Sequence, residues 1–149
     1  MKYGSLILEK NDFLMTRKFM GQNPTLEDYV HASILETLEQ NLKNAVVMDA
    51  GNMPLDIVRL YSKVTLVGPL NQRDSFLLVP PEEVGAANGL ISVVSSLGAS
   101  IIGFSKGDRI PFGLPGNRIT FKIEEVEQGV QKVKLSISDR DIEKMIPGQ

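Results

Sequence analysis

Apolar residues in the first third of the chain recur at the spacing of an α-helix. Phe13, Leu14 and Met20 form a modest stripe, which is ended by the breakers Gly21 and Pro24. A longer stripe follows, in which aliphatic residues recur every four positions: Leu26, Val30, Ile34, Leu38 and Leu42. Two striped segments joined by a short breaker predict an antiparallel helical hairpin, a short coiled coil.

The ends of these helices are predicted from polar residues. Asn11 or Asp12 is expected to cap the first helix. Thr25 is expected to start the second, with Asp28 in the acidic position of a capping box. The apolar repeat carries the second helix to about residues 46–47.

Beyond residue 50 the apolar pattern changes to alternation, which is typical of strands. Gly, Asn and Pro cluster at residues 49–54 and mark the boundary. The order of elements predicts an α+β fold, with a helical hairpin over residues 1–50 and an antiparallel sheet domain over residues 51–149. Strands are expected at residues 57–60, 64–67, 75–79, 90–94, 109–114, 119–123 and 133–137.

One short helix is expected inside the sheet domain. Leu97, Ile101 and Ile102 give it an apolar face, Ser95 or Ser96 is expected to cap its start, and Gly103 follows its end. We therefore expect this helix to lie on one face of the sheet.

Composition narrows the class of protein. With 42% hydrophobic residues among 149, the chain can bury a core. It has no cysteine, which excludes a disulfide scaffold, a Cys-ligated zinc site and a thiol nucleophile. The net charge of −2 supplies no cationic field for nucleic acid. No signal peptide or membrane-spanning run is apparent, so we expect a cytoplasmic protein without a membrane partner.

Few residues suggest catalysis. His31 is the single histidine, in the middle of a predicted helix, and a structural or surface role is expected for it. The glycines match no phosphate-binding loop. Glu27 and Asp28 form the one acidic pair of interest, and the simplest interpretation is that they cap the second helix and complement its dipole.

Residues 95–123 carry an ordered series of motifs. Ala99-Ser100-Ile101-Ile102-Gly103 is followed by Gly107-Asp108, by Leu114-Pro115-Gly116 and by an alternating strand. This series resembles the C-terminal domain of the GreA/GreB superfamily of transcript-cleavage (transcription elongation) factors. Residues 53–58 and 62–64 are similar to the regulator of nucleoside diphosphate kinase branch of that superfamily. The resemblance covers about residues 53–127 and is weaker over the first 50.

The resemblance implies a hairpin in front of an FK506-binding-protein-like (FKBP-like) domain. It also implies that Ser95, Ser96 and Leu97 form a polymerase-contacting loop, where the family often has Asp-Ser-Pro. Ser96 is the direct match, with a helix cap as its alternative role, and the acidic contact is missing from the triplet.

For Glu27 and Asp28 the resemblance implies a second role. Acidic residues at the hairpin tip of Gre factors help RNA polymerase to hold a second Mg²⁺, which promotes cleavage of backtracked RNA. Glu27 and Asp28 match by their place at the predicted tip. The hairpin is shorter than in the cleavage factors, and the chain alone is not expected to hold a cofactor or metal.

The leading hypothesis is a non-enzymatic bacterial transcription regulator that binds RNA polymerase at or near the secondary channel. It would modulate elongation or compete with longer channel factors, and meet nucleic acid only through the transcription complex. Three alternatives remain: Gre-type stimulation of cleavage through Glu27 and Asp28, a prolyl-isomerase-like or peptide-binding module, and a hairpin protein with an unrelated partner.

Overall fold

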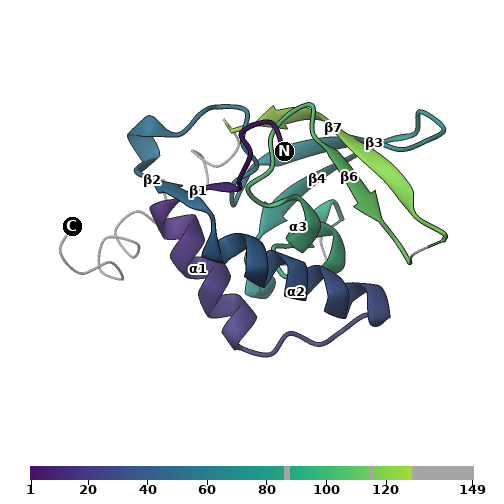
Figure 1. Cartoon of the computed structure of the whole chain (residues 1–149), viewed down its shortest axis with the longest axis horizontal. Helices are drawn as coiled ribbons and strands as arrows, with labels where there is room; N and C mark the ends of the chain where they lie inside the picture. The colour runs from purple at the N-terminus through teal and green to yellow at the C-terminus, as the bar shows by residue number, and fades with distance from the viewer. Residues whose placement is uncertain (86–87, 115, 129–149) are drawn as a thin grey trace.

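The computed structural model describes residues 1–85, 88–114 and 116–128 of the chain (Figure 1). The first half holds two helices between two short strands: β1 (Ile7–Glu9), α1 (Lys10–Gly21), α2 (Tyr29–Lys43) and β2 (Val46–Met48). The second half holds β3 (Lys63–Val67), β4 (Arg73–Val79), β5 (Leu90–Ser92), α3 (Ser96–Ile101), β6 (Arg109–Phe112) and β7 (Ile119–Glu127). Single 3₁₀ turns, η1 (Ala50–Asn52) and η2 (Pro81–Glu83), lie in the connections.

The main sheet has five strands in the order β5-β4-β3-β7-β6. Its central pairs are antiparallel, as predicted, but β5 runs parallel to β4. The wholly antiparallel sheet expected from the sequence is therefore wrong at this edge. η2 lies in the connection after β4, and β5 aligns with the end of β4, so that Leu90 pairs with Leu77 and Ser92 with Val79.

The three helices lie on one side of the main sheet, with α3 beneath β6 and with α2 below α3 (Figure 1). This arrangement confirms the α+β class. One apolar cluster fills the space between the layers and includes side chains from every part of the described chain, among them Leu8, Phe19, Leu38, Leu78, Ile101 and Ile123.

That cluster crosses the boundary expected at residue 50. Leu38 and Leu42 of α2 are buried against the same core as Val64 and Leu78 of the sheet. The division into residues 1–50 and 51–149 stays a prediction about domains. The packing of described residues is continuous across it.

The start and the end of the second helix differ from the sequence expectation. Asp28, not Thr25, is the N-cap, because its carboxylate accepts from the backbone N–H of His31 at 2.9 Å. Leu26 therefore lies outside the helix and is 52% exposed. At the other end, the Val46 N–H donates to the Leu6 carbonyl, which turns the expected last helical residues into β2 beside β1.

Two further expectations are corrected. Glu9, rather than Asn11 or Asp12, caps α1, since its carboxylate accepts from both of their backbone N–H groups. Residues 57–60 form only an isolated bridge, between Ile57 and Ser105, instead of a strand. The strand expected at residues 133–137 lies outside the described residues.

Both predicted helices of the first half are present, joined by residues 22–28. They diverge at the loop, and α2 has its main helix contact with α3 (Figure 1). The coiled-coil pairing of α1 with α2 and the FKBP-like class of the sheet stay predictions. None of the described helices is long and apolar enough to cross a lipid bilayer.

Candidate functional site

The structure brings together the two stretches singled out in the sequence, the Glu27-Asp28 pair and the loop Ser95-Ser96-Leu97. The connection after α1 contains Asn23 in a left-handed conformation (φ 53°) followed by Pro24. Asn tolerates this conformation, and the turn returns the chain toward the sheet before α2 begins. As a result, residues 27–28 lie beside the start of α3.

The carboxylate of Glu27 binds Ser96. One of its oxygens accepts from the Ser96 backbone N–H at 2.8 Å and the other from the Ser96 hydroxyl at 3.0 Å. Ser96 is buried, while half of the Glu27 side chain is exposed. A charged acceptor shortens and strengthens such bonds, so the carboxylate is held in one place while its outer part still faces solvent.

His31 connects the loop of residues 22–28 to the segment before α3. Its ring is buried, Nδ1 accepts from the Glu27 backbone N–H at 2.9 Å, and Nε2 lies 2.7 Å from the Val94 carbonyl. Because Nδ1 accepts, the proton must sit on Nε2, which donates to Val94; the imidazole is then neutral. His31 thus has the structural role expected of it.

Each residue of the loop has a partner within the chain. The Ser95 hydroxyl accepts from the Gly98 N–H and donates to the Ser92 carbonyl, so Ser95 is the N-cap of α3. Ser96 binds Glu27, and Leu97 packs, partly buried, against the main core. The expected cap role falls to Ser95, and a contact of this loop with a partner stays a prediction.

A hollow of about 420 Å³ opens beside the Glu27 carboxylate. Apolar walls come from four elements of the fold: Phe19 of α1, Pro24 of the loop, Pro81 of η2 and Val94. Glu27 and His31 line it as well, and the remaining lining side chains are neutral and polar. Among the lining residues there is one carboxylate and no Lys or Arg.

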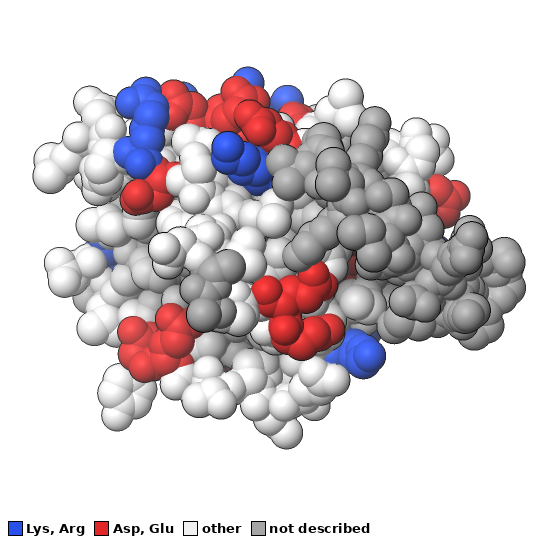
Figure 2. Space-filling model, turned by 180° about the vertical axis from the view of Figure 1, so that it is seen from behind, with Lys and Arg blue, Asp and Glu red and all other residues white. Residues whose placement is uncertain are grey.

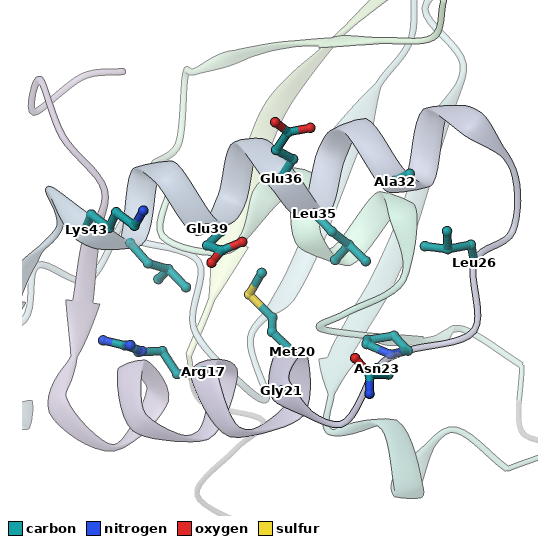
Figure 3. Close-up of a pocket in the computed structure, with 12 residues that line it drawn as sticks. Arg17, Met20, Gly21, Asn23, Leu26, Ala32, Leu35, Glu36, Glu39 and Lys43 are labelled. Atoms are coloured by element: carbon teal, nitrogen blue, oxygen red, sulfur yellow. The ribbon is translucent and has the colours of Figure 1, made fainter.

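A second, larger groove of about 690 Å³ lies between α1 and α2 (Figure 3). Met20 and Leu35 point into it from opposite walls. Arg17 and Lys43 lie at one end and Leu26 near the other. Its charges are of both signs, since Glu36 and Glu39 of α2 also line it.

Charges elsewhere are largely interspersed. Figure 2 shows basic and acidic side chains mixed along the upper edge of the rear face, and two separate acidic groups below. Arg73 pairs with Glu124 at 2.7 Å, and Lys106 with Glu125 at 3.3 Å. The side chains of both pairs are exposed, so these pairs lie on a solvated face of the protein.

A buried acidic cluster joins α1 to the loop before β3. Arg59 lies 3.8 Å from Glu9 and 3.4 Å from Asp12, which also accepts from the Leu60 N–H. Burial raises the pKa of the Asp12 carboxyl to about 7, against the opposing effect of Arg59. The cluster lies in the interior, since Glu9 and Asp12 are both below a tenth exposed.

A metal centre finds no support in the described part of the chain, where no group of three or more His, Asp or Glu residues converges on a common point. The two carboxylates of residues 27 and 28 do not act as a free pair, since Glu27 binds Ser96 and Asp28 binds the N–H of His31. Their role as metal helpers stays a prediction.

Sequence reasoning missed the contact of Glu27 with Ser96 and the bridge through His31. These residues are separated by 69 and 63 positions from their partners Ser96 and Val94. Periodicity reports neighbours along a helix or strand and carries no signal for such contacts. The single histidine beside an acidic pair was the one available hint.

The second half of the chain matches a known protein family. The family model described as transcription elongation factor GreA/GreB, C-terminal, matches residues 53–128. This range includes the whole of the loop Ser95-Ser96-Leu97 and all five strands of the main sheet.

Proteins of similar sequence carry the name transcription elongation factor GreA. The chain is 30% identical over 102 residues to transcription elongation factor GreA of Clostridium botulinum, covering 68% of this chain and 63% of that protein. It is 32% identical over 101 residues to the GreA factor of Clostridium kluyveri, covering 67% of this chain and 63% of the relative. The matched part thus spans less than two thirds of the length of these relatives.

A solved structure shares the fold. The prokaryotic transcription elongation factor GreA/GreB from Nitrosomonas europaea superposes with a TM-score of 0.65 at 21% identity, covering 83% of this chain and 98% of that one. The likeness supports the mixed α+β fold with its helices and curled sheet.

Proposed function

Because the chain belongs to the GreA/GreB family of transcription elongation factors, we propose that it is a transcription regulator that binds RNA polymerase at or near the secondary channel. The observation that carries the proposal is the family match over residues 53–128, in which the loop Ser95-Ser96-Leu97 lies. The protein acts through its partner and is not itself an enzyme. It works in the cytoplasm, where the polymerase is, and meets nucleic acid only through the transcription complex.

In this proposal the sheet part anchors the protein on RNA polymerase, and the α1–α2 part is directed toward the secondary channel. Two observations support this division of roles: the family match, which starts at residue 53, and the position of the loop after α1 beside α3. We propose modulation of elongation, or competition with longer channel factors, as the mode. The nearness to the regulator of nucleoside diphosphate kinase branch and the FKBP-like class of the sheet remain predictions.

Stimulation of transcript cleavage is not favoured by the contacts of the acidic pair. Glu27 and Asp28 each have a partner within the chain, so they do not form a free acidic pair at the tip of the α1–α2 part. Peptide isomerisation has no observation in its favour either, with aromatic residues at only 6% of the sequence.

The test is binding of the full chain to core RNA polymerase, measured by fluorescence anisotropy, in competition with a full-length GreA factor. We expect saturable binding that the GreA factor displaces. Failure to bind at micromolar concentrations would contradict the proposed function. Binding without displacement would contradict the secondary channel as the binding site. Cleavage of a stalled transcript, measured in the same samples, is expected not to increase.

A further inference from the structure

We propose that the Glu27 carboxylate and the hollow beside it form a docking site for one basic side chain, Lys or Arg, of a partner protein. The partner named above, RNA polymerase, rests on the proposed function; the basic chemistry of the contact rests on the site itself. The loop after α1 and the loop before α3 together form the surface of this docking site.

The carboxylate is fixed before any partner arrives. Both of its oxygens accept from Ser96, at 2.8 and 3.0 Å, and its backbone N–H is held by the buried ring of His31. A group already held in one conformation loses little freedom on binding, which favours affinity. Among the described contacts, the exposed Glu36 of α2 has no such anchor.

The charge of the carboxylate is not neutralised within the chain. In the described part of the structure, neither Lys nor Arg forms an ion pair with Glu27, and His31 is neutral with its proton on Nε2. The side chain is half exposed, and a carboxylate offers about four acceptor positions, of which Ser96 occupies two. Capacity for a further donor therefore remains.

The hollow suits a basic side chain better than other ligands. Phe19, Pro24, Pro81 and Val94 offer apolar walls, against which the long aliphatic stem of Lys or Arg can pack while its charge reaches the carboxylate. No cation lines it, and Glu82 and Glu83 follow Pro81 along η2, so the local charge is acidic. An anionic ligand would be repelled.

A divalent cation is a poorer occupant. Ca²⁺ takes about six to eight oxygen ligands, and Mg²⁺ is usually held by one or two carboxylates that leave room for its bound waters. One carboxylate lines this hollow, both of its oxygens already bind Ser96, and the neighbouring Asp28 caps α2.

The decisive experiment uses the full chain and a probe that needs no polymerase. The ¹⁵N-labelled protein is titrated with the blocked tripeptides Gly-Arg-Gly, Gly-Lys-Gly and Gly-Gln-Gly, and the amide signals of Glu27 and Ser96 are followed. We expect saturable shifts of these signals with the Arg or Lys peptide and none with the Gln peptide.

The variant Glu27→Gln keeps the shape of the side chain and an acceptor for Ser96 but loses the charge. Its affinity for the basic peptide is expected to fall roughly tenfold or more. Glu36→Gln is the matched control, with the same change in net charge on an exposed residue of α2, and it is expected to bind as the parent does. An unchanged Gly98 amide signal shows that both variants keep the Ser95 cap of α3.

Equal binding by Glu27→Gln and the parent, or equal shifts with the neutral peptide, would overturn the proposal. The same variants are then tested on core RNA polymerase. A positive peptide result with a parent that does not bind polymerase refutes the proposed function and leaves this inference standing. A parent that binds polymerase, with a negative peptide result, refutes this inference alone.

Discussion

Single residues at the start of α3 decide how tightly the loop closes on the sheet. Gly98 is the clearest case, because a Cβ built on it would lie 1.9 Å from the Ser92 carbonyl oxygen and 3.0 Å from Cδ1 of Leu78. Ser92 belongs to β5 and Leu78 to β4, so both neighbours are part of the main sheet. The absence of a side chain at position 98 is what allows β5 and α3 to approach so closely.

Replacing Gly98 by alanine is therefore expected to destabilise the protein by roughly 2–4 kcal/mol, since backbone must shift to admit the methyl group. Urea unfolding followed by circular dichroism measures the change. Gly21→Ala is the control: this glycine is also helical, and a Cβ there meets nothing within 4 Å. Similar stabilities for the two variants would show that the close approach at α3 is relaxed in solution.

Asp12 gives a residue-scale prediction about pH. Burial raises the pKa of its carboxyl from 3.8 to about 7, although Arg59 opposes the shift and Glu9 adds to it. Between about pH 4 and 7 the folded protein then holds a proton that the unfolded chain releases. The contribution of Asp12 to stability is full below pH 4 and falls as the pH rises through 7.

The variant Asp12→Asn, which keeps an acceptor for the Leu60 N–H, is expected to lose less stability than the parent between pH 5 and pH 7.5. The scale is on the order of 1.4 kcal/mol for each pKa unit titrated in that range. Urea unfolding at the two pH values measures it, with Asp49→Asn at an exposed position as the control. Parallel pH profiles for parent and Asp12→Asn would count against the buried, protonated carboxyl.

At the scale of elements, α1 and α2 begin at polar capping residues, Glu9 and Asp28, whose positions the apolar stripes do not predict. The sequence pattern placed the second helix from Thr25, but the stripe residue Leu26 is exposed and the helix begins at Tyr29. The reason is the bond from the His31 N–H to the Asp28 carboxylate, together with burial of the His31 ring. A capping bond and a buried ring outweigh one more turn of helix.

Asp28→Ala is expected to cost about 1 kcal/mol of stability, because the N–H of His31 loses its acceptor, whereas Asp28→Asn keeps the cap and is expected to cost less. Thermal unfolding of the three proteins measures the difference. If Asp28→Ala is as stable as the parent, the carboxylate is not needed as a cap, and a role toward a cation at the polymerase gains support.

For the whole molecule, the continuous core is the feature that matters. Leu38 of α2 is 2% exposed and lies in one cluster with Leu78 and Ile123 of the sheet. Elements on both sides of residue 50 therefore stabilise each other. This packing also fixes the position of the loop after α1 against α3, and with it the site at Glu27.

We expect the protein to unfold in one cooperative transition, with equal calorimetric and van't Hoff enthalpies. Leu38→Ala is expected to lower stability by roughly 2–5 kcal/mol while keeping a single transition. Hydrogen exchange should show loss of protection in β3 as well as in α2. Two calorimetric transitions, or protection lost in α2 alone, would instead support two independent units divided near residue 50.

The local elements were within reach of the sequence. Alternation predicted β3, β4, β6 and β7 to within a few residues, and the Ser-rich start and Gly103 bounded α3. The motif series after residue 95 indicated the family. These features depend on neighbours within a few positions, so the order of residues alone determines them.

Tertiary structure decided the rest. Whether residues 46–48 extend a helix or pair with β1 depends on the Leu6 carbonyl, far away in the sequence. Whether Glu27 is a free tip residue or a partner of Ser96 depends on how α2 packs on α3. Such contacts form between residues that no periodic pattern relates, because they are selected by burial of a shared core. The sequence by itself determined most of the local elements and the family to which they belong; the packing of α2 on α3 decided what the acidic pair can do.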